Sequence, residues 1–204
     1  MQKMQHITEK ELDILQYFYT WKRGHVRRIK KEVKISEHTL LKYLKTLEKR
    51  DMLHSSKEGN LKIYEVNTKS GLVKIFFSYF DFERLETLEY KRSKAVKLFV
   101  SLLKDVKMPY FVLLFGSTAK GTFTAKSDID LIAIFENACA ISEKAENIKR
   151  NVLAETGLKV NAIVMDMDEF KKEKVNKSNY ALQDAVATGY PVFGNQIYYE
   201  AIWD

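Results

Sequence analysis

Short amphipathic segments separated by polar breaks make up the first third of the chain. Thr8 and Glu11 have the spacing of a helix capping box, and leucine and aromatic residues follow at helical intervals. A second helix is predicted over residues 26–33, where apolar residues recur three and four positions apart. A third should begin after Ser36, a residue type that commonly caps helices. Residues 61–66 alternate as a strand behind a glycine-containing turn, which predicts a hairpin after the helices.

The third predicted helix has two different faces. Its apolar stripe should pack inward and consists of Leu40, Leu44 and Leu47. The opposite face is polar and basic, and it contains His38, Thr39, Lys42, Tyr43, Lys45 and Lys49. The hairpin adds Lys57 and Lys62, and the second helix adds Arg27, Arg28, Lys30 and Lys31. Such a surface suits a polyanion, although each lysine taken alone is as well explained as a solvated residue.

Residues 71–107 are predicted to form one connecting helix. Apolar residues recur there mostly at steps of three and four, and the polar side carries charges of both signs. Pro109 cannot continue a helix and marks its end. This segment either packs between two domains or pairs with a second copy of the chain, and the pattern leaves both alternatives open.

A continuous apolar run at residues 111–115 predicts a strand that is buried on both faces. It ends at Gly116 and Ser117, where the N–H groups of a tight turn and a hydroxyl can donate to phosphate oxygens. The next strand carries Asp128 and Asp130 on one face, and these carboxylates repel each other unless a cation lies between them. Oxygen ligands of this kind suit Mg²⁺ together with water and phosphate, so the spacing predicts a metal–nucleotide site.

The remainder of the chain continues to alternate helix and strand. A helix is predicted over residues 138–156, with Gly157 as its stop and Cys139 as a small buried residue, and a strand over 158–165. Two further helices are predicted over 169–175 and 180–188. A terminal hairpin is predicted from residues 190–194 and 197–199.

Composition and charge separate the two regions. The 204 residues carry a net charge of +7, and residues 1–70 contain 16 Lys and Arg against 9 Asp and Glu, whereas residues 71–204 contain 18 of each. The first region is therefore suited to double-stranded DNA, or it has a lysine-rich solubilising surface. The single cysteine excludes an internal disulfide and a multi-cysteine zinc site. No apolar run approaches the roughly 18–20 residues that cross a bilayer, so we expect a cytoplasmic protein with no membrane partner.

Residues 36–67, SEHTLLKYLKTLEKRDMLHSSKEGNLKIYEVN, resemble the winged helix-turn-helix family. The resemblance implies that the third helix enters the major groove and that the hairpin, or wing, contacts the backbone or minor groove. It implies contacts to bases or phosphates for His38, Thr39, Lys42, Tyr43 and Lys45 of the helix and for Lys57 and Lys62 of the wing. It implies phosphate contacts for Arg27, Arg28, Lys30 and Lys31. Winged-helix proteins commonly bind paired half-sites as dimers, so the resemblance also allows a homodimer.

The segment FGSTAKGTFTAKSDIDLIAI, residues 115–134, resembles the signature of the DNA polymerase β-type nucleotidyltransferase superfamily and, within it, the minimal nucleotidyltransferases. The resemblance implies that Gly116 and Ser117 hold a nucleoside triphosphate, with ATP as the first candidate. It also implies that Asp128 and Asp130 are catalytic ligands of one or two Mg²⁺ ions. Two nearby lysines are either phosphate contacts or surface residues, namely Lys120 and Lys126.

One position departs from the family pattern. The family has a third carboxylate on a later strand, and the matching position here is Asn161, which we expect as a weak metal ligand. An amide cannot act as a general base, and loss of that help costs on the order of 10²–10⁴ in rate. The departure allows either a slow transferase or a domain that binds a nucleotide without turning it over.

Together these patterns predict an α+β protein in three parts: a winged helix-turn-helix at 1–70, a connecting helix at 71–107 and a nucleotidyltransferase domain with a mixed sheet at 108–204. We expect a DNA-binding protein that regulates transcription, binds Mg–NTP and transfers a nucleotidyl group to an unknown hydroxyl. The alternatives are a regulator with a catalytically weak nucleotide sensor and a DNA-binding scaffold with a vestigial aspartate pair. Minimal nucleotidyltransferases often act as antitoxins, so a partner toxin protein is also implied.

Overall fold

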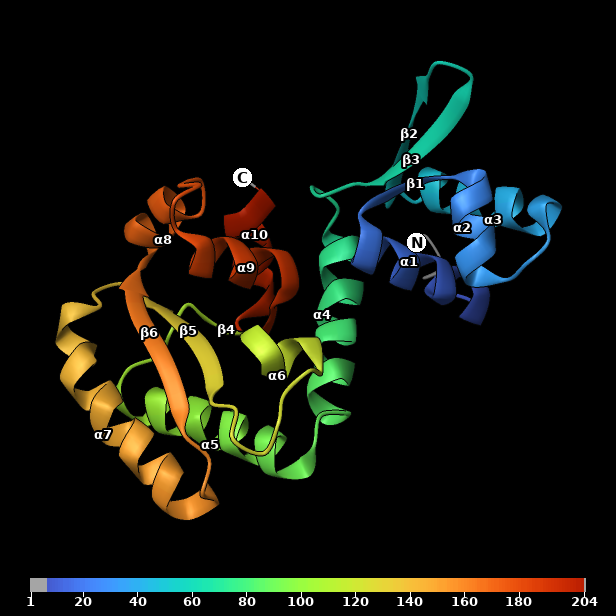
Figure 1. Cartoon of the computed structure of the whole chain (residues 1–204). Helices are drawn as coiled ribbons and strands as arrows, with labels where there is room; N and C mark the ends of the chain where they lie inside the picture. The colour runs from blue at the N-terminus through green and yellow to red at the C-terminus, as the bar shows by residue number, and fades with distance from the viewer. Residues whose placement is uncertain (1–6, 204) are drawn as a thin grey trace, which may run out of the picture. The chain divides into compact units, whose positions relative to one another are not determined.

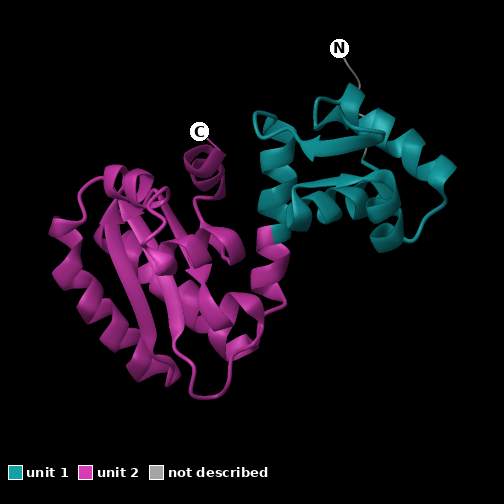
Figure 2. Ribbon diagram, turned by 45° about the horizontal axis from the view of Figure 1, so that its top comes forward, with its two compact units in different colours: residues 1–80 teal, residues 81–204 magenta. Residues whose placement is uncertain are grey.

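The computed structural model describes residues 7–203, and the chain divides into two compact units, Met1–Phe80 and Asp81–Asp204 (Figure 2). In the first unit, the elements follow one another in the order α1 (Glu9–Trp21), β1 (Arg23–His25), α2 (Val26–Val33), α3 (Glu37–Lys49), β2 (Leu53–Glu58) and β3 (Leu61–Val66). This order, with β2 and β3 as a hairpin, is the winged helix-turn-helix arrangement predicted from the sequence (Figure 1).

The helix starts follow from side-chain caps. Thr8 and Glu11 form both hydrogen bonds of the predicted capping box at the start of α1. The Ser36 hydroxyl accepts from the Thr39 N–H at the start of α3, and Leu40, Leu44 and Leu47 are fully buried as predicted. Strand β1 has no counterpart in the sequence prediction. It pairs antiparallel with β3, which makes a sheet of order β1-β3-β2.

The prediction of a single connecting helix over residues 71–107 is wrong. The structure has α4 (Gly71–Glu86) and α5 (Tyr90–Val106), separated at residues 87–89. The Thr87 hydroxyl donates to the carbonyls of Glu83 and Arg84 where α4 ends. The apolar face of α5 belongs to the core of the second unit, and it includes Val96, Phe99 and Leu103. Helical spacing was read correctly, but spacing alone does not reveal a change of direction.

The second unit is built on a four-stranded mixed sheet of order β6-β5-β4-β7. Its strands are β4 (Phe111–Phe115), β5 (Ile129–Phe135), β6 (Val160–Asp166) and β7 (Tyr190–Phe193). Strand β5 runs parallel to β6 and antiparallel to β4, and β4 also pairs antiparallel with β7. All five residues of β4 are buried, as the continuous apolar run predicts.

Helices cover both sides of this sheet. Helix α5 and α7 (Cys139–Thr156) pack on one face, where Ile129, Leu131 and Ala133 point (Figure 1). The other helices are α6 (Gly116–Lys120), α8 (Met167–Glu173), α9 (Tyr180–Thr188) and α10 (Asn195–Trp203). Because side chains alternate along a strand, Asp130 lies on the face opposite α5 and α7.

Two smaller expectations are wrong. Residues 197–199 are not a hairpin strand but part of α10, where Tyr198 and Tyr199 are buried on one side of a helix. Two aromatic residues in a row fit a strand or a buried helix equally well, so the local pattern could not decide. Cys139 is exposed instead of buried, because it is the first residue of α7 and precedes the inward stripe that starts at Ile141. None of the helices within residues 7–203 has the length and hydropathy of a membrane span.

Candidate functional site

The turn from β4 into α6 brings the glycine–serine pair against the aspartate strand. Phe115 is the register partner of Asp130, and Gly116 follows with a φ of +68°. A Cβ atom on Gly116 would overlap the carboxylate of Asp130. The position therefore requires glycine both for its left-handed backbone and for the close approach of Asp130. Ser117 comes next along the same turn and is half-buried.

Asp128 lies two residues before Asp130, immediately before β5, and its carboxylate forms an ion pair with a lysine. The Lys159 Nζ lies 2.7 Å from Asp128 Oδ2, with 67% and 36% of the two side chains exposed. This hydrogen bond and the charge of Asp128 raise the pKa of the Lys159 ammonium above its ordinary value, and Asp130 adds to the same effect. The backbone fixes the pairing, since the Ile129 N–H donates to the Lys159 carbonyl at 2.9 Å.

Asn161 lies beside Asp130, as expected for the position of the missing carboxylate. The two residues are register partners in the parallel β5–β6 pair, and Asn161 Nδ2 donates to Asp130 Oδ1 at 3.1 Å. The amide therefore orients Asp130, but it cannot accept a proton from a substrate.

The oxygen donors gathered here are of the kind that a hard divalent cation prefers. Asp128, just before β5, and Asp130, within it, supply carboxylate oxygens, and the side-chain carbonyl of Asn161 is a third oxygen near Asp130. No group of three His, Cys, Asp or Glu side chains suited to a metal ion occurs between residues 7 and 203. A divalent ion here would complete its shell with water or phosphate oxygens, as Mg²⁺ commonly does.

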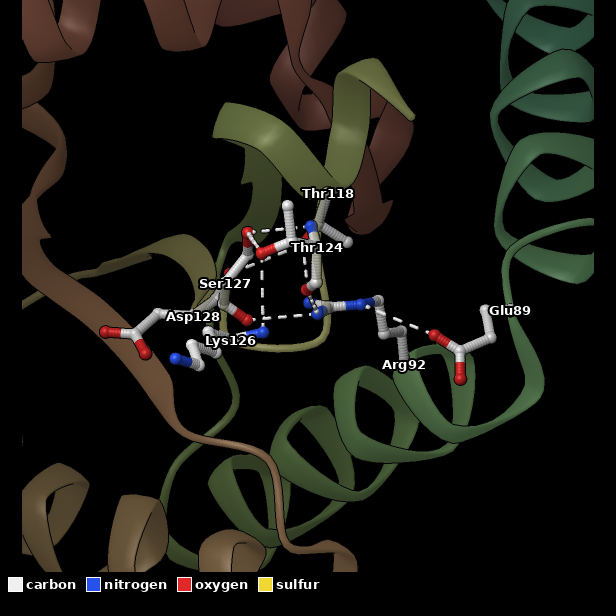
Figure 3. A network of polar contacts seen from close by, with 7 residues as sticks. All are labelled: Glu89, Arg92, Thr118, Thr124, Lys126, Ser127 and Asp128. Carbon is white, nitrogen blue, oxygen red and sulfur yellow. Dashed lines mark hydrogen bonds and ion pairs between the residues drawn. The ribbon is translucent and has the colours of Figure 1, made fainter. Parts of the chain in front are cut away.

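A buried arginine holds the loop that carries Asp128 (Figure 3). Arg92 of α5 is 1% exposed and donates to the Thr118 hydroxyl at 3.0 Å and to the carbonyls of Thr124 and Ser127 at 2.8 and 3.0 Å. Its guanidinium also stacks on the Phe123 ring at 4.2 Å. These contacts tie α6 to the 122–128 loop, while the Asp128 carboxylate points away from the guanidinium (Figure 3).

Sequence reasoning missed both Arg92 and Lys159. The charged residues of the predicted connecting helix, Arg92 among them, are expected on its polar side. Arg92 nevertheless precedes Val96 and Phe99 by four and seven residues and so lies on the apolar stripe. That spacing was an available signal. Lys159 carried no such signal, because its role depends on which strand pairs with β5.

The two lysines predicted near the phosphates lie in different surroundings. Lys120, at the end of α6, pairs with Asp184 of α9 at 2.8 Å. The Lys126 side chain is exposed on the loop before Asp128. A role for either lysine in phosphate binding stays a prediction.

In the first unit, the predicted DNA-contacting side chains are exposed on three elements. Helix α3 presents His38, Lys42 and Lys45 to solvent, and Thr39 and Tyr43 lie half-buried beside them. Lys57 and Lys62 are direct register partners in the hairpin, so two like charges face each other there. On α2, Arg27, Arg28, Lys30 and Lys31 are exposed.

Several of these cations already have partners within the unit. The Lys62 Nζ lies 3.4 Å from Glu48 and over the ring of Tyr64. Arg28 stacks on Trp21 at 4.4 Å, and Lys30 lies 3.5 Å from Glu37. Exposed pairs of this kind contribute only about 0–1 kcal/mol, so they do not prevent the lysines from binding phosphate.

Comparison with family models gives a match that lies within the second unit. Residues 92–186 match the family model described as "Nucleotidyltransferase domain". This range contains the glycine–serine turn, both aspartates and Asn161, and it begins at Arg92. No curated protein matches the chain.

Solved structures give distant matches. The DNA-binding protein Sso10a-2 from Sulfolobus solfataricus is 23% identical, with 38% of this chain and 82% of that one covered and a TM-score of 0.31. The adhesin competence repressor AdcR from Streptococcus pyogenes is 23% identical, with coverages of 50% and 70% and a TM-score of 0.35. The archaeal chromatin protein TrmBL2 is 13% identical, with coverages of 89% and 75% and a TM-score of 0.31. At identities below 25% and TM-scores below 0.5, what these proteins bind is not evidence of what this chain binds.

Proposed function

We propose that the chain is a DNA-binding transcriptional regulator whose second unit binds a nucleoside triphosphate, with ATP as the first candidate, and transfers its nucleotidyl group to a hydroxyl. One observation carries the nucleotide part of this proposal. The Asp130 carboxylate packs on Gly116, so the turn proposed to bind phosphate and the acidic strand lie against each other. The match of residues 92–186 to the nucleotidyltransferase family supports the same chemistry.

Each group of the proposed site has a separate role in the proposed reaction. The Gly116 N–H and the Ser117 hydroxyl donate to phosphate oxygens, and Asn161 keeps Asp130 oriented. Asp128 and Asp130 would hold a Mg²⁺ ion, which neutralises charge on the phosphates when bound. The acceptor oxygen bonds to the α-phosphorus, the bond from that phosphorus to the bridging oxygen breaks, and pyrophosphate leaves. The acceptor proton passes to solvent because the Asn161 amide cannot take it, and this predicts slow turnover.

The transfer is tested with labelled ATP, Mg²⁺ and candidate acceptors, which include protein, RNA and small-molecule hydroxyls and a partner toxin. We expect label on an acceptor with the native chain and its loss in Asp128→Ala. Asp168→Ala is a matched control, because Asp168 is an exposed aspartate on α8. Absence of transfer to every acceptor, or equal labelling by Asp128→Ala, would count against a transferase.

A second candidate function is favoured by Asn161, which replaces a possible base with a hydrogen-bond donor to Asp130. In this alternative the second unit senses ATP and alters DNA binding without consuming it. Duplex DNA affinity is then measured with and without Mg–ATP, while pyrophosphate release is followed in the same samples. A changed affinity without release supports the sensor, and release at a steady rate supports the transferase.

The DNA part of the proposal is supported by the winged-helix arrangement and by the excess of cations in residues 1–70. If about five phosphates are contacted, log K should fall with log salt at a slope near −4 to −5. Lys42→Ala and Lys45→Ala should each reduce that slope by about one, whereas Lys171→Ala, an exposed lysine of α8, should not. A slope near zero for the native chain would remove DNA from the proposal.

A homodimer on paired half-sites is part of the same proposal. Leu72, Ile75 and Tyr79 are exposed at helical spacing along α4, with 45%, 63% and 43% of each residue accessible. Sedimentation of the full chain with and without DNA tests it. A monomer in both states would contradict paired binding.

A further inference from the structure

The two aspartates each contact a residue at the start of β6, and one of these residues is a cation. Lys159 lies beside Asp128, and Asn161 lies beside Asp130. The backbone bond from the Ile129 N–H to the Lys159 carbonyl holds the start of β6 in this register. The position of Lys159 therefore follows from the strand pairing as well as from the reach of its side chain.

The carboxylate oxygens of the site are already partly used. Asp128 Oδ2 accepts from Lys159 at 2.7 Å, and Asp130 Oδ1 accepts from Asn161 at 3.1 Å. The other oxygen of Asp130 lies against Gly116 on one side. Two negative charges and one positive charge leave this cluster with a net charge of −1.

We infer that the Lys159 ammonium is a built-in second cation of this site, so that the site takes one divalent ion instead of two. The inference rests on the proposed nucleotide-binding function. Two divalent ions about 3.5–4 Å apart need anionic oxygens between them. Two aspartates that already share their charge with an ammonium supply too few. One divalent ion and the ammonium together carry three positive charges, which leaves a net charge of +1 to meet a triphosphate.

The exposed stem of Lys159 allows both contacts that this role requires. Its side chain is 67% exposed, so the ammonium can move from Asp128 to a phosphate oxygen when an ion binds the aspartates. Lys159 thus competes with a metal ion when nucleotide is absent and adds a cation to the triphosphate when nucleotide is present. Its removal should therefore have opposite effects on the two ligands.

The test counts Mn²⁺ bound to the full-length protein by electron paramagnetic resonance, without nucleotide and with saturating α,β-methylene ATP. The signal from nucleotide alone is subtracted. We expect one Mn²⁺ per native chain. In Lys159→Met, Mn²⁺ affinity without nucleotide should rise on the order of tenfold, because a like charge near the ion is gone. Affinity for the nucleotide should fall by a similar factor.

Lys97→Met is the matched control, because Lys97 also pairs with an acid, Glu86, at 2.7 Å, and its side chain is 47% exposed. It should leave both affinities unchanged. Two Mn²⁺ ions per native chain, or unchanged affinities in Lys159→Met, would overturn the inference while leaving the proposed function in place. If the native chain binds no Mn²⁺, the inference and the proposed metal–nucleotide site fail together.

Discussion

Arg92 shows how one buried side chain can determine the position of a distant loop. A guanidinium that is removed from water must be met by acceptors, and Arg92 finds three of them in α6 and the 122–128 loop. It ties α6 to the loop that carries Asp128 without contacting the Asp128 carboxylate. The residue is therefore a positioning residue for the site.

Arg92→Met should destabilise the second unit by about 1–3 kcal/mol, because the Thr118 hydroxyl and the part-buried carbonyls of Thr124 and Ser127 lose their donor. Nucleotide affinity should fall with it, since the loop before Asp128 loses its anchor. Urea unfolding measures the first effect. Arg150→Met is the control, because Arg150 is exposed and donates a hydrogen bond to the Asn147 side chain on the same helix. This substitution should change the free energy of unfolding by less than about 0.5 kcal/mol. Equal losses in both variants would contradict the buried network.

Gly116 combines two demands that can be separated experimentally. Gly116→Ala should cost about 1–3 kcal/mol and displace Asp130, because a left-handed backbone and an overlap act together. Gly121 has nearly the same φ, +70°, and a Cβ added there would have nothing within 4 Å. Gly121→Ala therefore measures the cost of the left-handed backbone alone. Metal affinity should fall only in Gly116→Ala. If both variants keep native affinity, Asp130 does not need its place against Gly116.

Helices and strands with local signals were predictable. The capped helices α1 and α3 begin where Thr8 and Ser36 indicate, and α7 ends before Gly157, which is left-handed. Elements that depend on distant partners were not predictable. Strand β1 has three residues and exists through its pairing with β3, and α10 is distinguished from a strand by burial against the rest of the second unit.

Helix α3 allows a direct test of its two faces. Leu44→Ala should lower the free energy of unfolding by about 2–5 kcal/mol, because Leu44 is completely buried and the change leaves a cavity. Leu41→Ala, on the same helix with Leu41 42% exposed, should cost well under half as much. Thermal unfolding followed by circular dichroism compares them. Similar losses would mean that α3 does not pack through this stripe.

Over the full chain, the sequence alone places the glycine–serine turn near the aspartates, but it does not predict which cations lie beside those aspartates. The charge asymmetry and the spacing from Gly116 to Asp130 are properties of the linear sequence, and Asn161 followed from the family pattern. The pairing of Lys159 with Asp128 and the burial of Arg92 arise only when α5, β5 and β6 come together. A site formed by strand pairing is therefore read from sequence only in part.

The buried tyrosines of the second unit predict how the protein responds to alkaline pH. Burial raises the pKa of Tyr190 to about 12, although the Arg84 guanidinium above its ring opposes the shift, and burial also raises the pKa of Tyr198. Because the pKa of Tyr190 in the folded protein exceeds the ordinary value of about 10, the contribution of the neutral phenol to the free energy of unfolding is fully present below pH 10. It is lost as the pH rises from 10 to about 12.

For Tyr190 alone, this loss should reach about 2–3 kcal/mol in the free energy of unfolding. Urea unfolding at pH 8 and at successive steps up to pH 12 measures it. Tyr190→Phe keeps the ring under Arg84 but removes the ionisable group, so it should lose less stability than the native chain over the same range. Parallel curves for the two proteins would show that phenolate formation at Tyr190 does not limit folding.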